Sequence, residues 1–236
     1  MARKEDLRKQ RKGTIINETS KRQEALLPKA LSIIVSKLMK KFPSIELHHE
    51  KSWPLPNIIN KLKSTFPDVV FFCYHKTSSM RPDGGILSII TKNGATYPIL
   101  IIEKKNQGTN DLRALEGMTK QAKGNAIERL GKNVIGFRTA LLGESIFPFV
   151  CFGDGCDFAS DSSILDRVVT IAMFGELNKE CVHNIGSNGV FNRGTFYFRP
   201  AEWTIEEIVE KSYSIAEKSV YYYYSKYGES EFKKKR

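Results

Sequence analysis

Two acidic residues and a lysine near the middle of the chain have the types and spacing of a site for a divalent cation. Asp83 follows a proline in the stretch RPDGG, and Glu103 and Lys105 end the apolar run ATYPILIIEKK. Because side chains alternate along a strand, Glu103 and Lys105 project to one face, whereas Lys104 points away and offers a cation only its backbone carbonyl. Carboxylate and carbonyl oxygens are the ligands that Mg²⁺ prefers. A cation there can polarise a phosphate and activate water, while Lys105 positions that water and neutralises developing charge.

A β-hairpin is expected to bring the two acids together. The strand-like runs GILSIIT and ATYPILII are joined by an Asn-Gly pair at 93–94, the strongest short sequence signal for a hairpin. With a two-residue turn there, counting back along both strands places Asp83 opposite Lys104, beside Glu103. A salt bridge at the end of a strand is the alternative, because short acid–lysine pairs of this kind are common on protein surfaces.

A second group of polar residues lies on a predicted helix within KQAKGNAIERLGKN. Asn125, Glu128 and Arg129 stand at i, i+3 and i+4, which is one helix face. Asn can bind adenine N6 and N7, Arg can bind purine acceptors, and a carboxylate can accept from an exocyclic amine in the major groove. The alternative is an ordinary solvated helix face on which Glu128 pairs with a lysine.

The charge of the whole chain favours a polyanionic partner. Its 37 Lys and Arg residues outnumber 26 Asp and Glu, which gives a net charge of +11 and a pI near 9.4. No apolar run approaches the ~20 residues that span a bilayer. The basic N-terminus lacks the apolar segment of a secretory signal. We therefore expect a cytoplasmic protein with nucleic acid, rather than a membrane, as its partner.

The four cysteines fit a reducing compartment. None of them forms a CxxC pair, and Cys151 stands in the strand-like run FPFVCF. Cys151, Cys156, Cys181 and His183 have ligand types that could just complete a zinc site, but buried free thiols are favoured for all four cysteines, Cys73 included.

Hydrophobic patterning predicts an α/β chain in one domain. Helices are expected over 22–42, 57–66, 109–142 with loops near Gly117 and Gly131, 162–174 with Ser162 or Ser163 as N-cap, and 204–228 capped by Thr204. Besides the hairpin, strands are expected over 68–74, 147–152 and 195–199. The domain covers 21–230, between a flexible basic arm over 1–20 and a basic C-terminal tail over 231–236.

Four blocks, RPDGG, IIEKKNQG, KGNAIER and FPFVCFGDGCDF, make the chain resemble a known family in order and spacing. They resemble the EcoRI-like type II restriction endonucleases of the PD-(D/E)xK superfamily, the group around EcoRI and MunI that shares the GNAxER motif. The resemblance covers roughly residues 65–185. It implies a restriction-endonuclease-like core, a central mixed β-sheet flanked by helices. It also implies that Asp83 and Glu103 bind Mg²⁺ with the Lys104 carbonyl, and that Lys105 is the catalytic lysine.

The resemblance also implies how DNA is read. Asn125, Glu128 and Arg129 match residues that read the inner AATT through its adenines, and the last two also bridge a homodimer. Arg167 matches an arginine near the outer base pair. The DNA-binding segment further includes Gln121, Lys123 and Ala126. The chain departs from the family pattern at Lys104, which replaces a small residue, at 120–123, which replaces an apolar stretch, and at Ile164, which replaces a second arginine.

The implied function is Mg²⁺-dependent cleavage of both strands of palindromic double-stranded DNA containing AATT, with 5′ overhangs. GAATTC is favoured as the site, and CAATTG or AATT alone stays open. A bacterial or archaeal cell would need a cognate adenine methyltransferase to protect its own sites. Two alternatives remain: a PD-(D/E)xK nuclease that reads DNA structure, against which GNAIER argues, and a non-cleaving DNA-binding protein, against which Asp83, Glu103 and Lys105 argue.

Overall fold

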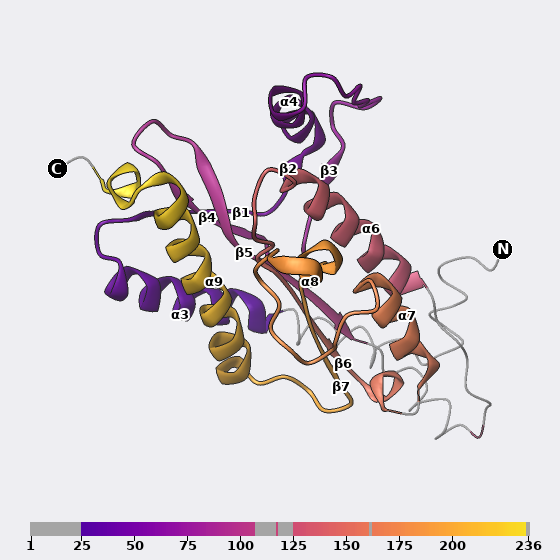
Figure 1. Cartoon of the computed structure of the whole chain (residues 1–236). Helices are drawn as coiled ribbons and strands as arrows, with labels where there is room; N and C mark the ends of the chain where they lie inside the picture. Colours follow the sequence, from indigo (N-terminus) through magenta and orange to yellow (C-terminus); the bar gives the residue numbers. More distant parts are fainter. Residues whose placement is uncertain (1–24, 107–116, 118–124, 161, 235–236) are drawn as a thin grey trace.

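A mixed five-stranded sheet runs through the computed structural model, which describes residues 25–106, 117, 125–160 and 162–234 (Figure 1). The strand order is β1-β4-β5-β6-β7, with bounds Glu46–Glu50, Ile86–Ile90, Thr96–Asn106, Phe149–Asp154 and Thr195–Arg199. β1, β4 and β5 pair antiparallel, whereas β5, β6 and β7 pair parallel. The predicted α/β fold with a mixed sheet flanked by helices is confirmed.

Helices cover both faces of the sheet (Figure 1). α3 (Leu26–Lys41) and α9 (Ile205–Tyr227) pack on one face, and α6 (Asn125–Ala140) and α7 (Ser163–Ile171) pack on the other. Successive residues of β5 pack on opposite faces of the sheet. Ile101 belongs to the core under α6 and α7, and Ile102 belongs to the core under α3 and α9. A strand buried on both faces needs no polar position, which explains the continuous apolar run before Glu103.

The hairpin between β4 and β5 closes through a three-residue turn, not the predicted two-residue turn. The Thr91 N–H donates to the Ala95 carbonyl at 2.9 Å, and Gly94 has a φ of 85° at the end of the loop. Three-residue hairpin loops use a residue in this left-handed conformation, which glycine adopts without strain. The pairing beside the turn is consequently shifted by one residue from the prediction, with Ile90 opposite Thr96.

A β-bulge restores the predicted register further down the hairpin. The irregularity lies between Leu87 and Ser88, and beyond it Leu87 pairs with Leu100, as predicted. The extra residue on β5 compensates for the extra residue in the turn. The prediction that Asp83 lies opposite Lys104 therefore holds, although the turn on which it was based is wrong.

Most of the other predicted elements are present. α4 (Leu55–Thr65), β6, β7, α7 and α9 lie within two residues of their predicted bounds at most ends, and the Ser162 side chain caps α7. Thr204 and Glu207 form a capping box at the start of α9. β1, the short pair β2 (Trp53–Pro54) and β3 (Ser79–Met80), and helix α8 (Gly186–Phe191) were not predicted.

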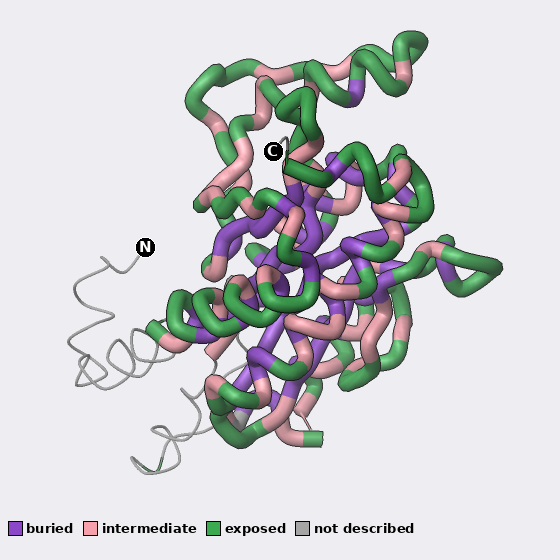
Figure 2. The backbone as a smooth tube through the Cα atoms, turned by 90° about the vertical axis from the view of Figure 1, so that its left-hand side faces the viewer, coloured by how far each residue is buried: buried purple, intermediate pink, exposed green. Residues whose placement is uncertain are grey.

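Three expectations are wrong. The run at 68–74 forms no strand; it follows α4 in a part of the chain that is mostly exposed (Figure 2). Val70 and Tyr74 are among its exposed residues. Strand-like residue types do not suffice without a neighbouring edge to pair with. Gly131 lies inside α6 instead of a loop. Of the three cysteines whose side chains the structure describes, Cys151 is a buried free thiol, whereas Cys73 and Cys181 are partly exposed.

Of the two predicted terminal segments, the structure describes the C-terminal one up to residue 234. The N-terminal arm at 1–20 and the first part of the predicted helix at 109–142 lie outside the described residues. The beginning of the predicted C-terminal tail packs on the core: Phe232 is buried against Tyr97, and the Lys234 N–H donates to the Ser44 carbonyl. Among the described helices, none is long and apolar enough to cross a membrane.

Candidate active site

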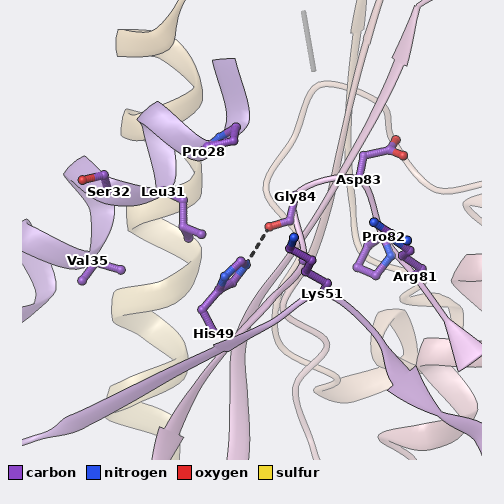
Figure 3. Close-up of a pocket in the computed structure, with 11 residues that line it drawn as sticks. Pro28, Leu31, Ser32, Val35, His49, Lys51, Arg81, Pro82, Asp83 and Gly84 are labelled. Carbon is purple, nitrogen blue, oxygen red and sulfur yellow. Dashed lines mark hydrogen bonds between the residues drawn. The ribbon is translucent and has the colours of Figure 1, made fainter. Parts of the chain in front are cut away.

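A tight glycine loop holds Asp83 at the base of the hairpin. The Gly84 N–H donates to the Ile102 carbonyl at 2.9 Å, and the Gly84 carbonyl accepts from His49 Nε2 at 3.1 Å (Figure 3). Gly85 has a φ of 76°, and a Cβ there would lie 2.3 Å from His49 Nε2. Only glycine fits this position, because a side chain would be both strained and in collision. The loop thus fixes Asp83 between β1 and β5.

The structure brings the three predicted catalytic residues together. Lys105 Nζ donates to Asp83 Oδ2 at 3.0 Å, to the Lys104 carbonyl at 3.1 Å and to Glu103 Oε1. The Lys104 N–H donates to Asp83 Oδ2 at 3.1 Å, and the Asp83 N–H donates to Glu103 Oε2 at 3.2 Å. Each acid is therefore held in place by backbone as well as by Lys105.

Burial sets the electrostatics of this cluster. The side chain of Glu103 is 2% exposed, that of Lys105 15% and that of Asp83 30%. Burial raises the pKa of Glu103, against the effect of Lys105. Burial by itself lowers the pKa of Lys105, but the carboxylates of Glu103 and Asp83 outweigh it and raise that pKa above its ordinary value. The lysine stays charged, and two carboxylates facing one ammonium leave the cluster attractive to a further cation.

The donor set fits a hard divalent metal ion. Asp83 Oδ2, Glu103 Oε1 and the Lys104 carbonyl converge on the single positive charge of Lys105. Oxygen donors of these two kinds are those that Mg²⁺ and Ca²⁺ take in proteins. The residues named from the sequence therefore form a chemically suitable site, open on the side of Asp83.

Helix α6 contributes a residue to this site that the sequence analysis missed. Asn133 Nδ2 donates to Glu103 Oε1 at 3.2 Å. Asn133 stands one turn after Arg129, on a side of the helix shared with the predicted base-reading residues. The spacing alone was a usable signal, but only the packing of α6 on β5 shows that this position reaches the acid.

The predicted DNA-reading residues are only partly within the described structure. Glu128 and Arg129 are exposed near the start of α6, and Arg167 is exposed on the neighbouring helix α7. Asn125 and Ala126 form the first turn of α6, but their side chains lie outside the described structure, as do Gln121 and Lys123 altogether. Ile164, by contrast, lies on the buried side of α7 and packs in the core.

Comparisons with known proteins agree on one group. A family model described as restriction endonuclease EcoRI matches residues 9–164, which include the three acid and lysine residues of the cluster and the start of α6. The type II restriction enzyme RsrI of Cereibacter sphaeroides is 28% identical over 240 residues, covering 88% of this chain and 87% of RsrI. The type II restriction enzyme EcoRI of Escherichia coli is 32% identical over 146 residues, covering 56% of this chain and 53% of that enzyme.

Proposed function

Because this chain belongs to the EcoRI family of restriction endonucleases, we propose that it cuts both strands of palindromic DNA at a site containing AATT. As a type II restriction enzyme it is a site-specific deoxyribonuclease that acts on double-stranded DNA with a divalent metal ion. We infer that this ion is Mg²⁺ and that the cuts leave 5′ overhangs. The convergence of Asp83, Glu103 and Lys105 at the base of the hairpin carries the proposal.

Each residue of the cluster has a distinct task in this reaction. Asp83 and Glu103, with the Lys104 carbonyl, would hold the metal ion. When bound, that ion polarises a phosphate oxygen and lowers the pKa of a bound water. Lys105 keeps a positive charge within hydrogen-bonding distance of both acids, where it can orient the attacking water and neutralise charge that develops on the phosphate.

Base recognition is assigned to α6 and α7. The exposed Glu128 and Arg129, with Asn125 at the start of the helix, would read the adenines of AATT in the major groove. Arg167 suits an outer guanine, which favours GAATTC over CAATTG or AATT alone. The burial of Ile164 supports Arg167 as the reading residue of α7, because the Ile164 side chain faces the core.

A homodimer follows from the symmetry of the site. A palindrome read by one module requires a second copy related by a two-fold axis. Glu128 and Arg129 lie at the end of α6 that would approach this axis, since they read the inner base pairs. A cognate adenine methyltransferase would protect the same sites in the host, and it would be a functional rather than a physical partner.

Digestion of DNA tests this function directly. A plasmid library with AATT in randomised flanks is incubated with the protein in Mg²⁺ or EDTA, and the ends are sequenced. We expect Mg²⁺-dependent cuts with 5′ overhangs at GAATTC, blocked by N6-methylation of the inner adenines. Equal cutting of all flanks would refute the six-base site. Nicking that follows DNA structure would indicate a repair-type nuclease, and binding without cuts a DNA-binding protein.

A further inference from the structure

A single buried carboxylate lies behind the catalytic strand, on the face opposite Glu103. Asp154 ends β6 and is inaccessible to solvent. Its carboxylate accepts hydrogen bonds from Lys104 Nζ, from Asn106 Nδ2 at 2.6 Å and from the Trp203 N–H at 3.4 Å. All three donors come from segments that end at this edge of the sheet, so Asp154 joins β5 to β6 and to the residues that precede α9.

The two β5 donors flank the catalytic lysine. Lys104 and Asn106 are the neighbours of Lys105 in the chain, and both are tied to the same carboxylate on the back of the strand. Lys105 itself pairs with Gly153 of β6, whose carbonyl accepts from Trp203 Nε1 at 2.9 Å. The backbone that carries the Lys105 side chain and the Lys104 carbonyl is therefore anchored on both sides of the reacting groups.

Stability alone is a weak reason for this arrangement. The side chains of Lys104 and Asp154 are 2% and 0% exposed. The desolvation of two buried charges offsets most of their attraction, so a buried ion pair often stabilises a fold no better than apolar residues of the same size. What such a pair does supply is geometry, because both charges need their partners in fixed positions.

We propose that Asp154 is a positioning residue for DNA cleavage. Through Lys104 and Asn106 it fixes the orientation in which β5 presents the Lys104 carbonyl to the metal ion and the Lys105 ammonium to the phosphate. This inference rests on the proposed function for its chemistry. Outer partners of metal ligands typically change metal affinity or activity by about 10- to 100-fold when they are removed, and the same range is expected here.

The principal variant removes both charges together. Lys104→Met with Asp154→Asn leaves no unpaired buried charge, and the new amide can still accept from Asn106. We expect single-turnover cleavage with Mg²⁺ to fall by about 10- to 100-fold, while DNA affinity measured in Ca²⁺ changes by less than about 3-fold. Binding of Mn²⁺ to the DNA-free protein, followed by electron paramagnetic resonance, should weaken by at least about 3-fold.

A matched control separates positioning from folding. Glu144 is also a buried carboxylate that pairs with a lysine and receives further donors, but it joins α9 to the loop before β6. Glu144→Gln with Lys226→Met should lower the melting temperature without changing Mn²⁺ affinity or the cleavage rate measured well below melting. Asn106→Ala, which keeps both charges paired, should reduce cleavage in the same direction as the principal variant even if the latter folds poorly.

The possible outcomes decide the proposal. Wild-type cleavage and Mn²⁺ affinity in both the double variant and Asn106→Ala would overturn it. An equal loss of cleavage and Mn²⁺ affinity in the control at the same drop in melting temperature would also overturn it, because the losses would then follow from reduced stability alone. If the wild-type protein binds Mn²⁺ but cuts no DNA, the proposed function is wrong. In that case, the Mn²⁺ affinity of the Lys104→Met, Asp154→Asn variant still tests whether Asp154 positions the metal ligands.

Discussion

Lys105 is the residue around which the site is organised. Its ammonium donates to Asp83, to Glu103 and to the Lys104 carbonyl, so the Lys105 Nζ atom marks the point where these oxygens converge. Alternation along a strand was enough to predict that Glu103 and Lys105 share a face. For Asn133, the helical spacing after Arg129 places it on the same side of α6, but its contact with Glu103 depends on how the helix packs across the sheet.

Removing the acids should separate cleavage from DNA binding. Asp83→Ala or Glu103→Ala should abolish Mg²⁺-dependent cleavage, and Lys105→Ala should lower the single-turnover rate by about 10²- to 10³-fold, because a charge placed for the transition state is lost. Specific DNA affinity in metal-free buffer should hold or increase, since the carboxylates repel phosphate. Rapid-quench cleavage and fluorescence anisotropy measure the two effects. The exposed Glu176 supplies a control, Glu176→Ala, and near-normal cleavage by Asp83→Ala would refute the metal site.

Helix α6 connects the predicted recognition residues to Glu103, the acid proposed to bind the metal ion. Glu128 and Arg129 lie in its first turns, and Asn133 reaches Glu103 one turn later. The helix continues through Gly131 and packs closely at Gly136, where a Cβ would lie 2.3 Å from Met80 Sδ. Through Asn133, a shift of α6 at its proposed DNA-reading end would be felt at Glu103.

Asn133→Ala tests this connection. Loss of the hydrogen bond to Glu103 should lower the cleavage rate by about 10- to 100-fold, as for other outer partners of metal ligands, with little change in specific DNA affinity. Asn133→Asp should be more damaging, because it places a third carboxylate against Glu103. Lys132→Ala changes the exposed neighbour and should cut normally. Equal losses of affinity and rate in Asn133→Ala would instead place Asn133 in DNA binding.

The capping box of α9 predicts an acid-sensitive contribution to stability. A hydrogen bond from Arg199 and one from the Thr204 backbone lower the pKa of Glu207 from 4.5 to about 2. A lowered carboxylate pKa stabilises the fold above the unfolded-state pKa, and the contribution disappears as pH falls from there towards 2. Glu207→Gln should lower the free energy of unfolding by about 1 kcal/mol at pH 7 and hardly change it at pH 2. The effect at pH 7 is modest because solvent screens this partly exposed side chain. Urea unfolding at both pH values measures the difference, with the exposed Glu210→Gln as control; a pH-independent gap would contradict it.

Elements with strong local signals were predictable, and those that depend on a neighbour were not. Thr204 with Glu207 marks the start of α9, and periodic apolar residues mark α3, so both helices are where the sequence places them. The run at 68–74 has strand-like residues but lies on the surface, while β1, with two histidines and two acids, pairs with β4. An edge strand needs few apolar residues on its exposed side, so β1 lacks the apolar pattern by which a strand is predicted.

The excess of positive charge is a property of the whole molecule. A net charge of +11 favours association with a polyanion. Lys37, Lys40 and Lys41 lie on α3, which packs on the face of the sheet opposite α6 and α7. The positive charge of the chain is therefore not confined to the face of the sheet that carries α6 and α7.

Salt dependence measures how much of this charge contacts DNA. The logarithm of specific affinity should fall against the logarithm of salt concentration with a slope of about −0.9 per phosphate neutralised. Deleting residues 2–12 removes Arg3, Lys4, Arg8, Lys9, Arg11 and Lys12. If this arm contacts the backbone, the slope should become shallower by about 1 for each lost contact, without a change in base preference. Unchanged slope and affinity would mean that the arm is only a solubilising tail.

The bulge between Leu87 and Ser88 has a consequence for how such an enzyme can diversify. It separates the register of the hairpin tip from the register that sets Asp83 against Lys104. A residue gained or lost at the tip can be offset at the bulge. The length of the turn can then change without changing the alignment of Asp83 with Lys104. Related chains are then free to vary 92–95 in length across evolution while the spacing of their catalytic groups stays the same.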